Sequence, residues 1–205
     1  MKVFPGIILI LFLNTICKAQ IDTNTTTGKK VIFKIHQLKD ENINTIACYY
    51  VECSSQAPRV IMPDSCTSYN IVYILWENKH AFFIQKFDEC KTYRAAHMDP
   101  MFLQIIKKHL DVILKEKIYP PEYIRILNGK PPVYSLSQDH PCHTIFEIYL
   151  GSNYQVAGLN NFEVETKYIN GRHLNRNYYR NQKTFLNKLK LIAEKEAMVL
   201  NKAVN

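Results

Sequence analysis

The chain has 205 residues, a length at which a single domain can bury a sizeable hydrophobic core. Hydrophobic residues make up 47% of it and charged residues 21%, which excludes a wholly disordered chain. The net charge is +8, and no internal repeat of the kind that builds a solenoid is present in the sequence.

Residues 1–19 have the pattern of a secretory signal peptide. Lys2 gives a positive start, an apolar run (GIILILFLNTI) follows, and Ala19 is a small residue at the expected cleavage point. That run has about eleven residues, whereas a helix that spans a bilayer needs about 20. A lipidated Cys17 is the alternative, although Ile16 stands before it where a small residue is usual. We expect cleavage after Ala19, a secreted or periplasmic location in the cell envelope, and no transmembrane segment in the mature chain.

Cleavage there would remove Lys2 and Lys18 and leave a net charge of +6. Five cysteines would remain: Cys48, Cys53, Cys66, Cys90 and Cys142. An odd number in an exported protein predicts at most two disulfides and one free thiol. Because Cys48 and Cys53 are five residues apart on one predicted strand, their side chains should point to opposite faces.

The first part of the predicted domain is a polar entry followed by strands. Residues 20–30 are rich in threonine and are expected to form a tail that leads into one α+β domain at residues 31–205. The glycosylation sequon at Asn24 matters only if the source is eukaryotic. Residues 31–36 and 45–53 are predicted to be the first two strands. Residues 54–68 contain two prolines and are predicted to be a loop with a short extended piece at residues 59–62.

The segment of residues 69–90 is the centre of the predicted fold. Two runs of β-branched and aromatic residues, 69–76 and 80–87, flank a polar turn, which is the pattern of an antiparallel hairpin. Both faces of the first run are apolar. We therefore expect this hairpin to lie centrally in the sheet, with one face packed on a helix and the other also partly covered.

Two long amphipathic helices are predicted after the hairpin. In the first, Asp99 suits the N-cap, Pro100 suits the first turn, and apolar residues from Phe102 onward form one stripe that ends before Pro120. Residues 122–127 are predicted to add another turn or two. The second helix should run from about Arg176 to Ala203.

Further strands are predicted between these helices. A second hairpin should form at residues 143–156 around the Gly-Ser-Asn turn, and residues 162–169 alternate like a half-exposed strand. The elements together predict an α+β fold, in which an antiparallel sheet of about six or seven strands with hairpins is packed by the two long helices.

Three features combine into a resemblance to a known family. The signal ends in Ala19-Gln20, residues 73–90 read YILWENKHAFFIQKFDEC, and residues 139–143 read DHPCH before an apolar strand. This combination resembles a family of uncharacterised exported proteins of Bacteroidota bacteria with LW…KFD-C and DH-CH motifs. The resemblance runs from about residue 70 to the C-terminus. It implies a bacterial envelope or secreted location and no particular activity.

The densest group of reactive side chains consists of Asp139, His140, Cys142 and His143. Imidazole and thiolate are natural ligands of zinc and copper, so His140, Cys142 and His143 are candidate metal ligands. The two histidines are three residues apart, however, and would lie on opposite faces of a strand. We therefore favour a structural disulfide and expect no metal or other cofactor. The disulfide candidates are Cys90, Cys142, Cys53 and Cys66, with Cys90–Cys142 as the preferred pair.

The same group contains the residue types of a nucleophilic enzyme, namely a cysteine, two histidines and an aspartate. Neither a GxSxG nucleophile elbow nor a papain-like cysteine context accompanies it. We do not expect an enzyme. A metal-binding protein or hydrolase-type enzyme centred on Asp139 to His143 is the alternative.

A basic stretch stands out near the C-terminus. Between Glu165 and Glu194 there are seven cations and no acidic residue, with tyrosines among them. Arg172, Arg176, Arg180 and Lys183 are therefore candidates for contact with an anionic partner. A solvated surface that keeps the protein soluble is the simpler alternative. Nucleic acid is not expected as a partner of an exported protein.

The sequence as a whole predicts a non-enzymatic, exported binding or interaction module that is stabilised by disulfides. Its expected partner is another envelope or extracellular protein or an anionic surface.

Overall fold

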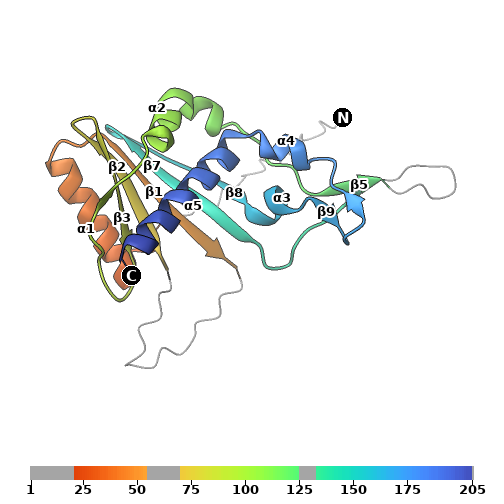
Figure 1. Ribbon diagram of the computed structural model, residues 1–205, viewed down its shortest axis with the longest axis horizontal. Helices are drawn as coiled ribbons and strands as arrows, with labels where there is room; N and C mark the ends of the chain where they lie inside the picture. The colour runs from red at the N-terminus through yellow and green to blue at the C-terminus, as the bar shows by residue number, and fades with distance from the viewer. Residues whose placement is uncertain (1–20, 55–69, 125–132, 205) are drawn as a thin grey trace, which may run out of the picture.

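The computed structural model describes residues 21–54, 70–124 and 133–204, and its centre is a six-stranded antiparallel sheet (Figure 1). The strands lie in the order β4-β3-β2-β1-β7-β8. Two small two-stranded sheets, β5–β6 and β9–β10, complete the described strands. The bounds are β1 Thr45–Cys53, β2 Val72–Asn78, β3 Ala81–Phe87, β4 Ala96–His97, β5 Glu122–Ile124, β6 Val133–Ser135, β7 Cys142–Leu150, β8 Asn153–Asn160, β9 Tyr168–Ile169 and β10 His173–Leu174.

Helices cover both faces of the large sheet. α1 lies against one face and α2 and α5 lie against the other, while α3 and α4 sit with the small sheets at one end of the molecule (Figure 1). The predicted α+β class, with a hairpin-rich antiparallel sheet packed by helices, is confirmed. The helix bounds are α1 Thr26–Asp40, α2 Met101–Ile113, α3 Asn161–Glu165, α4 Tyr178–Gln182 and α5 Phe185–Val204.

Alternating side chains on the strands divide the core into two layers. On β1, Ala47 and Tyr49 face α2 and α5, whereas Ile46 and Cys48 face α1. The larger layer also contains buried residues of both helices, among them Phe102, Leu103, Ile106, Leu186 and Leu189. The smaller layer contains Val31, Ile35, Leu38, Val72, Ile74 and Trp76.

The predicted central hairpin is formed by β2 and β3. Its turn is the two-residue pair Lys79 and His80, both with positive φ (47° and 69°), which matches the right-handed twist of the strands. β2 lies between β3 and β1 and is covered on both faces, as the apolar pattern predicted. The second hairpin, β7–β8, is also present and turns at Gly151 and Ser152.

The prediction of a strand at residues 31–36 is wrong, because this segment lies inside α1. The side chain of Thr25 caps the helix by accepting a hydrogen bond from the Gly28 N–H. Val31, Ile35 and Leu38 are buried at helical spacing. Burial of this apolar face favours the helix, although valine and isoleucine have a high intrinsic β propensity. Residues 26–30, expected to belong to a tail, form the first turns of the same helix.

The C-terminal helix expected from residue 176 onward is two helices, α4 and α5. The break occurs at Thr184, whose Oγ1 accepts a hydrogen bond from the Asn187 N–H. The carboxylate of Glu116 accepts hydrogen bonds from the N–H groups of Phe185 and Leu186. These contacts satisfy the free N–H groups of a new helix start, so α5 begins at Phe185.

Three other predicted elements differ from the structure. The first predicted long helix, α2, ends at Ile113, well before Pro120. β5 replaces the expected helical turns at residues 122–124, because it pairs with β6. Residues 162–169 form α3 and β9 instead of one strand, and the Asn160 side chain caps α3. The predicted signal segment and the extended piece at residues 59–62 lie outside the described residues.

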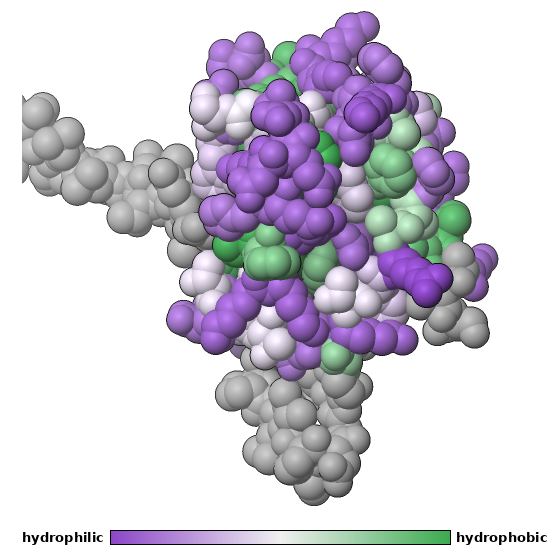
Figure 2. Space-filling view, turned by 90° about the vertical axis from the view of Figure 1, so that its left-hand side faces the viewer, coloured by the Kyte–Doolittle hydropathy of each residue, from purple (hydrophilic) through white to green (hydrophobic). Residues whose placement is uncertain are grey.

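The surface at the α1 end of the molecule is mainly hydrophilic, with small separate apolar patches (Figure 2). Among the described residues, no helix is both long and apolar enough to cross a bilayer.

Candidate functional site

Cys142 forms a disulfide with Cys53, so the preferred pairing of Cys142 with Cys90 is wrong. The two bonded cysteines are direct register partners at the ends of β1 and β7, with their Cα atoms 4.0 Å apart. Strand register therefore determines this pairing. Cys90 is also disulfide-bonded, and Cys66 lies outside the described residues.

The disulfide changes what residues 139–143 can do. The sulfur of Cys142 is not a thiolate and so neither attacks a substrate nor ligates a metal. Asp139, His140 and His143 are exposed on the surface around it. No group of three or more His, Cys, Asp or Glu side chains in the described part of the chain is arranged to hold a metal ion.

The four predicted anion-binding residues lie in what we call the basic end lobe, residues 166–183. Arg172 follows β9, Arg176 precedes α4, Arg180 is in α4, and Lys183 follows it; all four are exposed. Lys190, from the same basic stretch, does not belong with them. Its ammonium is buried between Glu165 (2.8 Å) and Glu194 (2.7 Å), so its charge is already compensated.

Buried asparagines hold this lobe to the rest of the protein. The side chain of Asn181 accepts a hydrogen bond from the Tyr119 N–H (3.1 Å) and donates to the carbonyls of Tyr119 (2.8 Å) and Glu163 (3.0 Å). Asn175 accepts from the Glu122 N–H (3.1 Å) and donates to the Thr166 carbonyl (2.8 Å). Both asparagines are fully buried. The cations that flank them are therefore mounted on a fixed backbone.

Aromatic rings accompany the cations of the lobe. The Arg180 guanidinium lies 3.6 Å from the centre of the Tyr119 ring and donates to its hydroxyl. Lys167 lies within cation–π range of the Tyr168 ring (5.4 Å). Tyr168 and Tyr179 expose 54% and 57% of their surface, so flat rings as well as positive charges face solvent.

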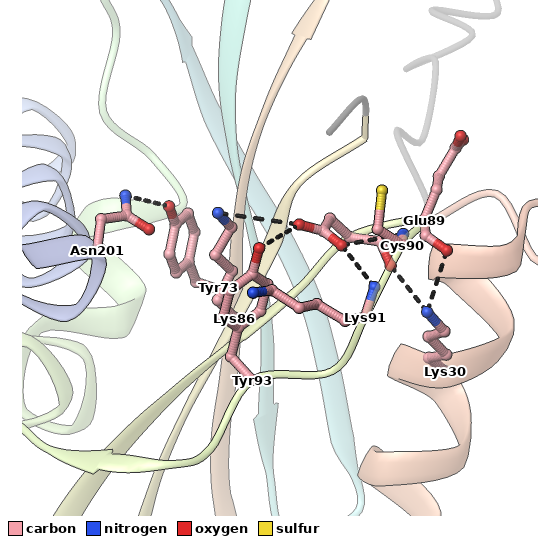
Figure 3. Close-up of polar contacts among 9 residues, drawn as sticks. Lys30, Tyr73, Lys86, Glu89, Cys90, Lys91, Tyr93 and Asn201 are labelled. Atoms are coloured by element: carbon pink, nitrogen blue, oxygen red, sulfur yellow. Dashed lines mark hydrogen bonds and ion pairs between the residues drawn. The ribbon is translucent and has the colours of Figure 1, made fainter. Parts of the chain in front are cut away.

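A second polar cluster is built around Asp88, the residue that follows β3. Figure 3 labels its neighbours Lys86, Cys90, Lys91 and Tyr93. The carboxylate of Asp88 accepts hydrogen bonds from the N–H groups of Cys90 (3.0 Å) and Lys91 (2.9 Å) and from the Tyr93 hydroxyl (2.8 Å). The Lys86 ammonium is 3.9 Å away. Burial alone would raise the pKa of Asp88, but these donors and Lys86 outweigh it and hold the pKa below its ordinary value.

The cluster connects three elements of the fold. Lys30 of α1 donates to the backbone carbonyls of Asp88 (3.1 Å) and Glu89 (3.2 Å). On the other side, Asn201 of α5 donates to the hydroxyl of Tyr73 on β2 (3.2 Å) (Figure 3). Lys30 thus ties the segment after β3 to α1, while the Asn201 bond ties α5 to β2, the strand that pairs with β3.

A surface cavity of about 420 Å³ adjoins this cluster. Its lining combines two cations, an aromatic ring and small apolar groups: Lys91, Thr92, Tyr93, Arg94, Ala95, Ala96 and Leu200. Sequence reasoning missed this site. The signal was present, because Lys91, Tyr93 and Arg94 follow immediately after the KFDEC motif.

A third feature that the sequence reasoning missed is the buried carboxylate of Glu147. It accepts hydrogen bonds from the Ile21 N–H (2.6 Å) and from the hydroxyls of Tyr50 and Tyr149 (3.1 Å each), and only 1% of Glu147 is exposed. Burial and this carboxylate raise the pKa values of both tyrosines. A lone acid inside the apolar run TIFEIYL was the available signal. All the hydrogen bonds join parts of the fold, so we assign Glu147 a structural role.

Comparison of the chain with protein-family models, with curated proteins and with solved structures finds no match.

Proposed function

We propose that this protein is a non-enzymatic, exported binding module whose basic end lobe binds an acidic polysaccharide outside the cytoplasm. The observation that carries the proposal is the set of exposed cations Arg172, Arg176, Arg180 and Lys183, in a stretch that contains no acidic residue from position 166 to position 193. Cations grouped in this way attract a polymer that carries repeated negative charges.

The fixed backbone that carries these cations favours a ligand-binding surface over a surface that only keeps the protein soluble. Because Asn175 and Asn181 fix the backbone of the lobe, little conformational entropy is lost when a ligand binds. A surface that only confers solubility needs no such fixation.

The exposed rings favour a polysaccharide over a membrane. Tyr168 and Tyr179 present flat, half-exposed faces beside the cations, and such faces suit the apolar faces of sugar rings. The exposed aliphatic side chain in the lobe is Leu174, a small area for insertion into a bilayer.

Export is the part of the proposal that rests on the sequence. The signal-like residues 1–19, the disulfide between Cys53 and Cys142 and the resemblance to exported Bacteroidota proteins support an envelope or secreted location.

The test compares retention of the protein on a heparin column with that of an Arg172/Arg176/Arg180→Ala variant. Each exposed charge contact is worth about 0.5–1 kcal/mol, so we expect the variant to bind roughly 10- to 100-fold more weakly and to elute at lower salt. A matched control, Lys29/Lys108/Lys195→Ala, removes the same charge from exposed positions on α1, α2 and α5.

Equal retention of the two triple variants would contradict the proposal, because net charge alone would then explain binding. Anionic lipid vesicles form a second arm. Binding to vesicles without retention on heparin would replace the polysaccharide with a membrane surface.

A further inference from the structure

We propose that the cavity beside Tyr93 is a binding site for a small organic acid, that is, a carboxylate carried on a short apolar chain. The site is separate from the basic end lobe. Leu200, which lines the cavity, is fifteen residues beyond Phe185, and this places it about 22 Å along α5 from the helix start that borders the lobe.

The charge balance of the cavity favours an anion. Lys91 and Arg94 line it, and among the described residues no acidic side chain does. Behind the lining, the buried Lys86 adds a third cation. The carboxylate of Asp88, 3.9 Å from the Lys86 ammonium, is the single negative charge of the cluster. The side chain of Glu89 points away from the cluster (Figure 3), where it accepts a hydrogen bond from Asn70.

Asp88 is already committed to its internal partners. One of its oxygens accepts the two backbone N–H groups, and the other accepts the Tyr93 hydroxyl and faces Lys86. It therefore compensates at most one of the three cations. No carboxylate of the described residues forms an ion pair with Lys91 or Arg94. An incoming carboxylate could therefore pair with both, and Arg94 can hold a carboxylate through two parallel hydrogen bonds.

The ring of Tyr93 gives the cavity a fixed wall. Its hydroxyl is held by Asp88, and the ammonium groups of Lys86 and Lys91 lie 4.5 Å and 4.6 Å from the ring centre. Because the hydroxyl donates inward, the ring offers the ligand an aromatic surface and not a hydrogen-bond donor. The lining thus combines two cations, Lys91 and Arg94, which we call the cationic rim, with aromatic and apolar surface.

The rest of the lining sets the kind of ligand. Ala95, Ala96 and Leu200 supply small apolar surfaces, which suit a short hydrocarbon chain. A volume of about 420 Å³ lies in the range of small-molecule sites and accommodates a carboxylate with a chain of about eight carbons. An inorganic anion such as phosphate would leave the apolar part unused.

The experiment is calorimetric titration of the full mature chain with octanoate, octanamide, acetate and inorganic phosphate. We expect saturable binding of octanoate, and binding of the other three probes at least tenfold weaker. Octanamide lacks the charge, while acetate and phosphate lack the apolar chain. Octanamide binding as tight as octanoate would overturn the proposal, and so would phosphate binding as tight as octanoate.

Two variants test the location. Lys91/Arg94→Ala removes the cationic rim and should weaken octanoate binding at least tenfold, while Ala95→Trp fills the cavity from an exposed position and should abolish binding. The control Lys108/Lys195→Ala has the same net charge as the first variant. If the rim variant and this control bind octanoate equally, the site is not here.

The ligand's carboxylate can come from a free acid or from the end of a peptide chain. An acetylated Val-Leu-Ala peptide with a free C-terminus, measured beside its C-terminal amide, distinguishes these sources. Tighter binding of the free-carboxylate peptide than of octanoate would identify a peptide terminus as the ligand.

Heparin retention of the rim variant should stay at the wild-type level, so the failure of this proposal and the failure of the proposed function can be told apart.

Discussion

Glu147 lies directly opposite Cys48 across the pairing of β7 with β1, on the face of the sheet that α1 covers. Both residues are almost completely buried. Two titratable groups thus face each other in an apolar layer, one with hydrogen-bond partners and the other a free thiol.

Replacing Glu147 should test how much the buried carboxylate stabilises the fold. Glu147→Ala leaves the Ile21 N–H and two tyrosine hydroxyls without their acceptor, so we expect a loss of about 3–5 kcal/mol in the free energy of unfolding. Glu147→Gln keeps one acceptor oxygen and should lose less. Urea unfolding measures both, and an equal loss in the two variants would contradict this account.

Cys48 should be the single free thiol of the mature protein. Burial, and secondarily Glu147, raise the pKa of this thiol, so it should react with iodoacetamide only after unfolding. We expect one label by intact mass on the unfolded, unreduced chain.

The variant Cys142→Ser should show two labels, because Cys53 is released from its disulfide. Its free energy of unfolding should fall by about 2–5 kcal/mol. A label on Cys142 in the wild type would contradict the observed pairing.

Acid should destabilise the protein through Asp88. The folded-state pKa of this carboxyl is lower than that in the unfolded chain, so its stabilising contribution is fully present above about pH 4 and is lost as the pH falls through the folded pKa. Asp88→Asn should be less stable at pH 6 and should lose less stability than wild type between pH 6 and pH 3. Guanidinium unfolding at both pH values tests this; parallel losses in the two proteins would exclude Asp88 as the cause.

Asn181 should affect function without a change in charge. Asn181→Ala removes three hydrogen bonds from a buried position, and we expect a loss of about 2–3 kcal/mol together with weaker heparin retention, because the basic end lobe loosens. Asn201→Ala, which removes one bond to Tyr73, is the control and should keep full retention. Unchanged retention in Asn181→Ala would show that the lobe needs no fixed backbone.

Gly28 is a helical position where alanine should destabilise. In an open helix, Gly→Ala gains about 1 kcal/mol, but a Cβ at Gly28 would lie 2.0 Å from the Asp22 carbonyl oxygen. We expect Gly28→Ala to lower stability by about 1–3 kcal/mol, whereas His36→Ala, at an exposed site on the same helix, should not. Thermal unfolding decides; a stabilised Gly28→Ala would mean that the segment before α1 moves freely.

The parts of the fold that could be predicted are those set by local pattern. The central hairpin followed from two apolar runs around a short turn, and α2 from one apolar stripe beginning at Phe102. α1 was missed because a short run of valine and isoleucine also suits a strand, and Phe33, 74% exposed, lies between the buried positions Val31 and Ile35.

The features that could not be predicted depend on contacts between distant segments. Cys53 meets Cys142 because β1 pairs with β7 in one register, which no spacing within the chain reveals. The start of α5 depends on a carboxylate from residue 116, sixty-nine positions before the N–H that it caps. The cavity beside Tyr93 likewise needs Leu200 from the other end of the chain.

The position of β1 between β2 and β7 also shapes the order of folding. β1 ends 89 residues before the cysteine at which β7 begins. At a synthesis rate of about 5–20 residues per second, β1 waits roughly 4–18 s with one edge unpaired. An unpaired edge in the middle of an apolar sheet is a site of aggregation, so the nascent chain should depend on a chaperone until β7 arrives. Pairing of that strand brings Cys53 and Cys142 into register, so docking of β7 favours the correct disulfide.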